Sequence, residues 1–176
     1  MLSDEYISEG SLINSIIAIL PNEKIYKILD PCCGSGKLIN DVSKHFSSEQ
    51  SIGVDLIPSI IDNASSTYSG IEFSCQDSTQ ELDFSSDFDL VIGALPIGAR
   101  CEKQNIAPHI STTNTSDLIL YKSLLKLKPG GTGIFLAAQN LLVGKTSKKI
   151  TKELSDLGIN PIGLLYVENP LGKRSG

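Results

Sequence analysis

The chain has 176 residues, a formal net charge of −5 and a hydrophobic fraction of 40%. These values are ordinary for a globular protein of one domain with a buried core, and the negative charge argues against a surface that grips a nucleic-acid backbone throughout. The apolar run from Leu12 to Leu20 is interrupted by Asn14 and Ser15 and is too short to span a bilayer, so we expect no membrane protein.

The first half of the chain alternates segments of helix and strand character. Its pattern predicts helices over residues 11–20, 37–46 and 58–68 and strands over residues 24–29, 51–54 and 71–75. Pro21 ends the first helix, and Pro58 suits the first turn of the third. Leu38, Val42 and Phe46 recur at the spacing of one helix face, which supports the second helix.

The second half continues this alternation with one long interruption. Residues 80–87 are too short and polar for a helix, whereas residues 88–93 have the continuous hydrophobicity of a strand buried on both faces. Residues 98–116 are rich in Ser, Thr and Asn and predict a loop. The pattern then predicts a helix over residues 117–127, a sharp break at Pro129-Gly130-Gly131, a strand over residues 133–138, a helix over residues 147–157 and a last strand over residues 162–167.

This order of elements predicts an α/β fold, a doubly wound and mostly parallel sheet with helices on both faces. We expect one domain over residues 1–176, with an N-terminal helical segment at 1–22, the core at 23–170 and a tail at 171–176. Ligands of such sheets bind outside the carboxyl ends of the strands, so the residues that follow each strand are the candidates for a site.

The first predicted strand runs into Asp30-Pro31-Cys32-Cys33-Gly34-Ser35-Gly36, and a helix starts at once. Glycines allow the positive φ of a tight turn and leave room for a ligand close to the backbone. Asp55 ends the second strand, where an acid can hold ribose hydroxyls, and Asp77 follows the third, where an acid can accept from an adenine amino group. Either acid alone is also a good cap for a following helix. Three acids in register with a glycine turn favour a nucleoside pocket.

Two common nucleotide motifs do not fit this turn. A dinucleotide fingerprint needs a third glycine where Ile39 stands. A phosphate-binding P-loop needs a glycine at Pro31 and a Ser or Thr at Leu38. A turn that starts with an acid and has no grip for phosphate suits a cofactor without phosphates that offers a cationic, amino-acid-like end to Asp30.

The motif Asp-Pro-Cys-Cys-Gly-Ser-Gly resembles the first motif of adenine-N6 DNA methyltransferases, a family that includes the modification subunits of type I restriction systems. Residues 6–9 resemble the segment that precedes the first helix of this family, and Lys128-Pro129-Gly130-Gly131 resembles the turn before the fifth strand of class I methyltransferases. The resemblance covers nearly the whole chain and implies a Rossmann-like fold with S-adenosyl-L-methionine as cofactor. The implied cofactor-binding residues are Tyr6, Ser8, Asp30, Cys32, Gly34, Gly36, Asp55, Leu56, Asp77 and Ser78.

The family's catalytic motif, Asn-Pro-Pro followed by Tyr or Phe, falls on Ala94-Leu95-Pro96-Ile97. In the family the Asn side chain and a backbone carbonyl accept the protons of the target amine, and the aromatic ring stacks on the flipped base. Leu95 and Pro96 are the candidate catalytic residues here, because the carbonyl of Leu95 can still accept one hydrogen bond. Ala94 has no side-chain acceptor and Ile97 no aromatic ring. Losing one aligned polar partner costs about 10²–10³ in rate, so the resemblance implies reduced or absent activity.

Other functions remain open on the same residues. The altered motif also fits a catalytically inactive pseudo-methyltransferase that serves as a scaffold or regulatory subunit. Methyltransferases of RNA bases or of protein glutamine share the Asn-Pro-Pro pattern and form a weaker alternative. After Val167 there is no room for a final antiparallel strand or a target-recognition region. We therefore expect a fragment, or a domain that a recognition or completing subunit completes.

A basic helix face is the candidate contact with DNA. Lys145, Lys148, Lys149 and Lys152 follow the i, i+3, i+4, i+7 spacing that places them on one side of a helix. They suit phosphate contacts at the rim of the site, but also an ordinary solvated face.

The cysteines bear on metal binding and on the cellular compartment. Cys32, Cys33, Cys75 and Cys101 form no CxxC pair, so we expect no metal site. They do not resemble a disulfide framework, and together with the acidic N-terminus they predict a reducing, cytoplasmic setting.

Overall fold

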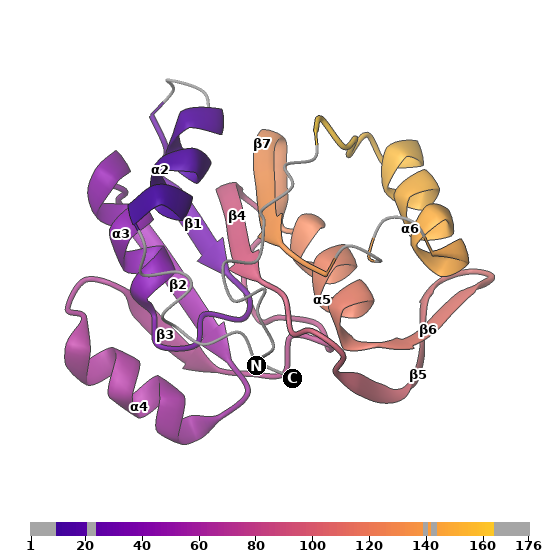
Figure 1. Cartoon of the computed structure of the whole chain (residues 1–176), viewed down its shortest axis with the longest axis horizontal. Helices are drawn as coiled ribbons and strands as arrows, with labels where there is room; N and C mark the ends of the chain where they lie inside the picture. The colour runs from indigo at the N-terminus through magenta and orange to yellow at the C-terminus, as the bar shows by residue number, and fades with distance from the viewer. Residues whose placement is uncertain (1–9, 21–23, 139–140, 142–143, 164–176) are drawn as a thin grey trace, which may run out of the picture.

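The computed structural model describes residues 10–20, 24–138, 141 and 144–163 (Figure 1). Its helices are α2 (Gly10–Ile19), α3 (Lys37–Phe46), α4 (Pro58–Thr67), α5 (Thr115–Leu124) and α6 (Lys145–Asp156). Its strands are β1 (Lys27–Asp30), β2 (Gln50–Asp55), β3 (Glu72–Cys75), β4 (Phe88–Ala94), β5 (Arg100–Ala107), β6 (Ile110–Asn114) and β7 (Leu127–Leu136).

Five parallel strands form the central sheet, in the order β3-β2-β1-β4-β7. The chain starts in the middle of the sheet, adds β2 and β3 on one side, and then returns to add β4 and β7 on the other. The order therefore reverses between β1 and β4, and ligand sites of doubly wound sheets lie at this switch point. The predicted doubly wound, mostly parallel sheet is confirmed.

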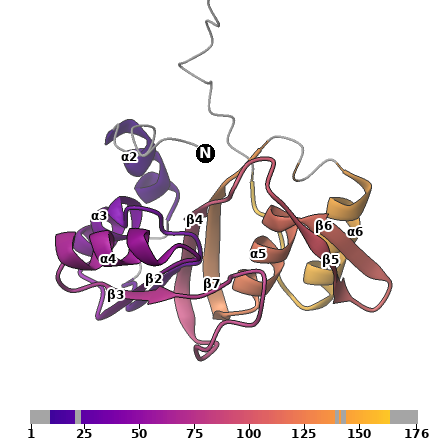
Figure 2. The same ribbon diagram turned by 90° about the horizontal axis from the view of Figure 1, so that it is seen from below.

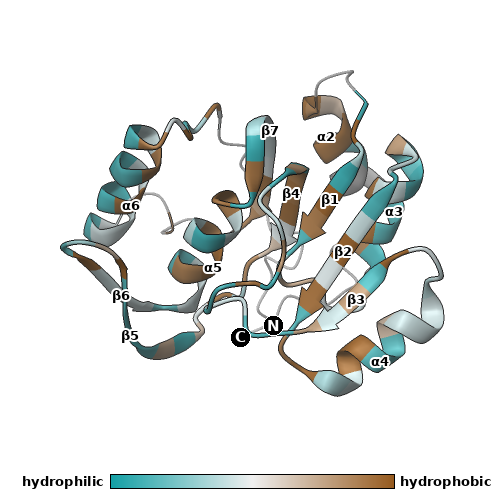
Figure 3. Ribbon diagram, turned by 180° about the vertical axis from the view of Figure 1, so that it is seen from behind, coloured by the Kyte–Doolittle hydropathy of each residue, from teal (hydrophilic) through white to brown (hydrophobic). Residues whose placement is uncertain are grey.

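Helices α2, α3 and α4 cover one face of this sheet (Figure 2). Apolar residues repeat on the inner faces of α2 and α3 and meet side chains of β1 and β4, which Figure 3 shows as largely hydrophobic strands. The shared core on this face includes Ile16, Ile28, Leu38, Ile39, Val42, Ile61, Leu90 and Ile92. A core of this size stabilises the sheet by removing apolar surface from water.

The opposite face of β1 and β2 is covered by an irregular segment instead of a helix. Leu82 and Phe84 pack against Leu29, Ile52 and Val54. Residues 80–87 contain no helix, as predicted.

Lys126, just before β7, holds this segment in place. Its ammonium group donates to Glu81 at 2.7 Å, to the carbonyl of Leu82 at 2.9 Å and to the carbonyl of Phe84 at 3.0 Å. The Lys126 side chain is only 7% exposed. These bonds satisfy backbone carbonyls that no helix or strand pairs, which allows the segment to lie against the core.

A β-hairpin replaces the predicted loop over residues 98–116. β5 and β6 pair antiparallel and form a second sheet, and His109 takes a positive φ of 72° at the turn between them. The loop prediction was wrong because it weighed the polar composition and missed the alternation: Ile110 and Thr112 are buried, whereas Ser111 and Thr113 are not. β-branched residues with period-two burial are typical of strands.

Helix α6 packs on this hairpin. Ile150 and Leu154 of α6 meet Ile110 of β6 and Tyr121 of α5 in one apolar cluster. Figure 1 shows α6 beyond α5, on the side away from the sheet. The hairpin, α5 and α6 thus form a small body beside the sheet.

Two further predictions need correction at the end of the sheet. The break at Pro129-Gly130-Gly131 lies inside β7, where four residues of β7 oppose one of β4 between the pairs Phe88↔Leu127 and Leu90↔Thr132. It is a bulge, which Gly130 permits with its φ of 79°. Ile162 and Gly163 are not in a strand, and the rest of the predicted last strand lies outside the described residues.

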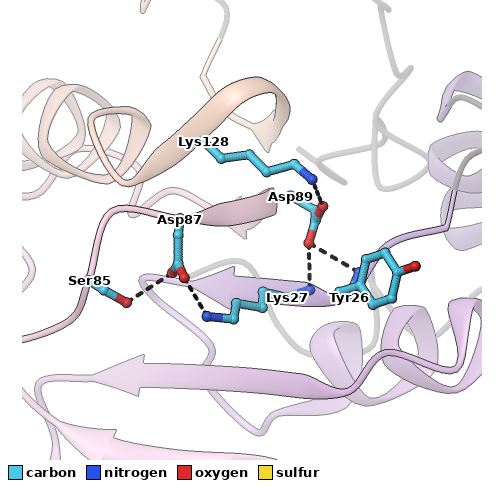
Figure 4. Close-up of polar contacts among 6 residues, drawn as sticks. All are labelled: Tyr26, Lys27, Ser85, Asp87, Asp89 and Lys128. Atoms are coloured by element: carbon cyan, nitrogen blue, oxygen red, sulfur yellow. Dashed lines mark hydrogen bonds and ion pairs between the residues drawn. The ribbon is translucent and has the colours of Figure 1, made fainter.

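Polar contacts close the amino-terminal edge of the sheet (Figure 4). The Asp89 carboxylate accepts from the backbone N–H groups of Tyr26 at 3.1 Å and Lys27 at 2.8 Å, and it also pairs with Lys128. Burial acts to raise the pKa of Asp89, but the hydrogen bonds from Lys128 and Lys27 outweigh it and lower that pKa. Asp89 thus joins β1, β4 and β7 at the edge opposite the strand ends on which the site is expected.

The Lys126 contacts predict a large stability effect. Lys126→Met leaves the carbonyls of Leu82 and Phe84 unpaired in the core, so we expect the free energy of unfolding to fall by about 2–4 kcal/mol. Urea unfolding followed by circular dichroism measures it. Lys149→Met, an exposed lysine of α6, is the matched control and should change stability by less than about 0.5 kcal/mol. Equal losses in both variants would contradict the anchoring role of Lys126.

Candidate functional site

The glycine turn joins β1 to α3, as predicted. Gly34 and Gly36 have φ values of 53° and 81°, a left-handed conformation that glycine adopts without strain. The turn is tied to the neighbouring strand by the backbone N–H of Cys33, which donates to the carbonyl of Val54 at 2.8 Å. A Cβ on Gly36 would lie 2.7 Å from the Phe73 ring. The glycines are therefore required by the turn and its packing, whatever ligand it holds.

Asp55 brings the end of β2 to this turn. One carboxylate oxygen of Asp55 accepts from the backbone N–H of Gly34 at 3.2 Å, and the other accepts from the N–H of Ile57 at 2.9 Å. Helix α4 begins after Ile57 without a side-chain cap, so Asp55 does not act as its helix cap. Leu56, the next residue, has a 64% exposed side chain at the same edge.

The segment after β3 is also joined to the turn. The Ser78 hydroxyl is buried and donates to the carbonyl of Pro31 at 2.6 Å. Asp77 uses one oxygen to accept from the backbone and the hydroxyl of Thr79, at 2.9 and 2.7 Å. No helix follows Asp77 within residues 76–87, so it caps a turn and not a helix. The ends of β1, β2 and β3 thus form one connected set of backbone and side-chain groups.

Asp30 lies beneath the turn with 1% of its surface exposed. Its carboxylate accepts from the backbone N–H of Cys32 at 3.0 Å, and Gly93 of β4 lies so close that a Cβ there would be 3.2 Å from Asp30 and 3.2 Å from the Cys32 sulfur. Burial raises the pKa of Asp30 to about 7, against the lowering effect of the Cys32 N–H and with a further rise from Asp55. A cation near Asp30 would restore its charged form.

The two cysteines of the turn are thiols at neutral pH. Burial, with the nearby Asp30, raises the pKa of both Cys32 and Cys33 well above its ordinary value. The Cys32 thiol instead donates a weak hydrogen bond to the carbonyl of Ala94 at 3.3 Å. Because the thiolate is the nucleophilic form, neither residue is suited to covalent chemistry, and Cys32 serves to join the turn to β4.

Residues 94–97 therefore lie beside the turn, as expected of a catalytic segment. The side chain of Leu95 is 1% exposed, and its N–H donates to the carbonyl of Leu136 at 2.8 Å. The carbonyl of Pro96 accepts from the Ser116 hydroxyl at 2.6 Å. Ile97 is 49% exposed. The described residues show no donor to the Leu95 carbonyl, and the 1% exposure of Leu95 places this carbonyl below the surface.

The remaining predicted residues are two near the N-terminus and the lysines of α6. Tyr6 and Ser8 are outside the described residues. The four lysines of α6, residues 145, 148, 149 and 152, are exposed on the helix that packs on the hairpin, and Lys152 pairs with Asp156. No group of His, Cys, Asp and Glu residues within the described ranges is arranged to hold a metal ion. None of the described helices is long and apolar enough to cross a membrane.

The contributions of Gly93, Ser116 and Asp117 were not predicted from the sequence. Gly93 lets β4 approach Asp30, and Ser116 fixes the segment after β4. Ser116 and Asp117 begin a helix whose cap is Asn114, which accepts from the Ser116 N–H at 3.1 Å. Asn114 with Ser116 and Asp117 after it is a helix-start signal. If the preceding strand had also been recognised, this signal would have placed these residues beside the site.

Comparisons with known proteins agree with this geometry. Residues 28–112 match the model of the methyltransferase domain family. No curated protein sequence matches the chain. Many solved structures share the fold, and three of them are described next.

A TehB-like, S-adenosylmethionine-dependent methyltransferase from Corynebacterium glutamicum superposes with a TM-score of 0.56 at 20% identity, over 79% of this chain and 71% of that one. A complex between the Trm112 methyltransferase activator of Haloferax volcanii and a methyltransferase gives a TM-score of 0.54 at 20% identity. The match covers 74% of this chain and 54% of that one. CalS10 from Micromonospora echinaspora, an amino pentose methyltransferase solved with S-adenosylmethionine, gives 0.52 at 20% identity, over 72% and 48%.

The chain thus spans about half the length of the last two proteins, and at these identities the likeness concerns the fold. The strand order, the glycine turn between β1 and α3 and the family match agree on one assignment. The chain has the Rossmann-like fold of class I methyltransferases, and its residues 28–112 are similar to the methyltransferase domain family.

Proposed function

We propose that this chain binds S-adenosylmethionine at the carboxyl ends of β1, β2 and β3 and transfers its methyl group to an acceptor beside residues 94–97. The observation that carries the proposal is that Asp30 and Asp55 accept from the glycine turn, and that Ser78, the neighbour of Asp77, donates to the Pro31 carbonyl of the same turn. The lysine next to this turn, Lys37, pairs with Asp41 at 2.8 Å. Such a site suits a ligand with an ammonium and a sulfonium group and disfavours phosphates.

Each predicted residue has a place in this proposal. The carboxylate of Asp55 has lone pairs beyond those used by Gly34 and Ile57, and these accept from the ribose hydroxyls. The exposed side chain of Leu56 lies against the adenine ring, and the second oxygen of Asp77 accepts from its amino group. The backbone of Cys32, Gly34 and Gly36 faces the methionine end, where Tyr6 and Ser8 remain predictions from the sequence alone.

Asp30 supplies negative charge beneath the methionine end. It is buried, and burial raises its pKa to about 7, so the protein without ligand holds a carboxyl group that is partly protonated at neutral pH. The ammonium group of the cofactor favours the ionised carboxylate. The residue types and burial at the site thus fit the cofactor.

The acceptor side is formed by residues 94–97. The sulfonium of bound S-adenosylmethionine makes its methyl group electrophilic. In this proposal the carbonyl of Leu95 accepts a hydrogen bond from the incoming nucleophile. The exposed side chain of Ile97 makes an apolar contact with it. Ser116 holds Pro96 in place through its hydroxyl, which keeps the segment fixed beside Cys32.

Adenine-N6 methylation of DNA is a second candidate, favoured by the Asp30–Gly36 motif. This reaction uses an Asn side chain, an aromatic ring and a backbone carbonyl. Ala94 replaces the Asn and Ile97 replaces the aromatic residue, so only the Leu95 carbonyl remains of the three. RNA or protein glutamine as the acceptor meets the same objection. The absence of a side-chain acceptor at Ala94 also suits an inactive scaffold that binds cofactor, with a partner subunit supplying recognition.

Calorimetric titration with S-adenosylmethionine tests the cofactor site. Asp55→Ala removes charged hydrogen bonds worth about 1.5–3 kcal/mol, so we expect at least about tenfold weaker binding. Asp62→Ala, an exposed acid on α4, is the matched control and should bind like the unaltered protein. The proposal fails if the unaltered protein does not bind the cofactor, or if Asp55→Ala and Asp62→Ala bind equally well.

The buried Asp30 predicts a pH dependence of stability without ligand. Its pKa is about 7 in the folded chain against 3.8 for the unperturbed group. Between these values the folded state holds a proton that the unfolded state has released, so the free energy of unfolding falls as the pH rises from about 4 to about 7. The loss is at most about 1.4 kcal/mol per pH unit.

The measurement compares urea unfolding of Asp30→Asn and of the unaltered chain across this range. The variant should lack the Asp30 contribution to the slope and gain stability relative to the unaltered chain as the pH rises. Asp62→Asn should leave the profile unchanged. Parallel profiles for Asp30→Asn and the unaltered chain would show that Asp30 ionises normally.

The altered motif predicts a gain of function. The Ala94→Asn, Ile97→Tyr double variant restores a side-chain acceptor and an aromatic ring, and we expect about 10²-fold more methyl transfer to adenine-containing DNA if that is the acceptor. Transfer of radiolabelled methyl groups measures it, with Ile97→Tyr alone as control. No gain in a variant that still binds cofactor, tested with any recognition subunit, would exclude the adenine candidate.

A further inference from the structure

A cavity of about 560 Å³ lies between the β5–β6 hairpin and the amino-terminal ends of α5 and α6. It shares no residue with the glycine turn, and its volume is in the range of small-molecule sites. Its lining residues are Arg100, Lys103, Ser111, Thr112, Thr113, Asn114, Asp117, Gly144, Lys145, Thr146 and Ser147. Three cations, six hydroxyl or amide side chains and one carboxylate thus face a single space.

One end of this cavity is positively charged. Arg100, Lys103 and Lys145 are exposed, and none of them makes an ion pair with a described residue; Arg100 donates to the Thr113 hydroxyl at 3.3 Å. Helix α6, of 12 residues, begins here with Gly144 as its cap, and its first turn has neither a side-chain cap nor an acidic residue. Backbone N–H groups at a helix start favour an anion.

The cavity is also lined by a buried carboxylate, one oxygen of which lacks a partner. Asp117 is 3% exposed, and one of its oxygens accepts from the Thr112 hydroxyl at 2.8 Å. Its other oxygen, Oδ1, has no hydrogen-bond partner among the described residues. Burial raises the pKa of Asp117, while Thr112 and Arg100 lower it. An unpaired buried carboxylate oxygen is costly, and a ligand that donates a hydrogen bond relieves that cost.

The cations and the Asp117 carboxylate together define the ligand. Three cations against one carboxylate leave an excess of two positive charges, which matches the charge of a phosphomonoester. Asp117 requires a donor on the same molecule, either a hydroxyl or an amine. A free inorganic anion meets the first requirement only.

We propose that this cavity binds a phosphorylated small molecule whose hydroxyl or amino group donates to Asp117. Ser116, next to Asp117, holds Pro96 through its hydroxyl, so the cavity is joined to the segment proposed to face the methyl acceptor.

Calorimetry with glucosamine 6-phosphate, glucosamine and inorganic phosphate as probes tests the cavity. Glucosamine 6-phosphate carries both features, and it should bind at least about tenfold more tightly than either other probe, because each loses one set of contacts. Lys103→Met should weaken both phosphate-bearing probes several-fold. The matched control is Lys149→Met, an exposed lysine of α6 outside the cavity, and it should have no effect.

Asp117→Asn distinguishes the contribution of the Asp117 carboxylate from that of the cations. It removes one acceptor charge, so it should lower the preference for glucosamine 6-phosphate over inorganic phosphate by about tenfold while phosphate itself binds as well as before. Asp117→Asn should still unfold cooperatively in urea, which checks that the variant is folded.

Two results would overturn the proposal. One is no binding of glucosamine 6-phosphate at millimolar concentration by the unaltered chain; the other is equal binding of glucosamine 6-phosphate and phosphate in both the unaltered chain and Asp117→Asn. Titration of S-adenosylmethionine into the same proteins reports on the proposed function separately, because none of these variants touches the glycine turn. Sugar phosphate binding without cofactor binding would sustain the cavity and refute the proposed function.

Discussion

The hydrogen bond between the Asp55 carboxylate and the backbone N–H of Gly34 is the contact on which the site depends. It fixes the end of β2 to the turn after β1 and leaves the second carboxylate oxygen to hold Ile57 at the start of α4. The backbone bond from Cys33 to Val54 acts beside it. These two bonds, of 3.2 and 2.8 Å, hold the glycine turn against the end of β2 and so place the two strand ends relative to each other.

The same turn organises the rest of that edge. Ser78 reaches Pro31 from the segment after β3, and Cys32 reaches Ala94 at the end of β4. Asp30 is buried below these contacts, where the small Gly93 admits it. The cost of burying an acid is one that structural residues rarely bear, and a cationic ligand offers a physical reason for keeping it.

Two segments distinguish this domain from a simple alternation of strands and helices. The segment held by Lys126 covers one sheet face where a helix is not formed, and the β5–β6 hairpin extends the connection between β4 and α5. The hairpin creates a surface on which α6 packs away from the sheet. A cavity with its own charge pattern results, and Ser116 of α5, next to the cavity residue Asp117, is bonded to Pro96 after β4.

The sequence by itself determined the alternation of strands and helices, the parallel sheet and the glycine turn with its three acids, because these depend on local periodicity and on backbone conformations that few residues allow. It did not determine the hairpin over residues 100–114, since polar strands differ from loops only once their partners bury alternate side chains. Tertiary structure alone decided that Cys32, Ser78 and Ser116 tie the strand ends together, and that Asp117 lines one cavity with three cations. Those contacts join residues far apart in the chain, and hydrogen-bond partners at such distances leave no periodic signal.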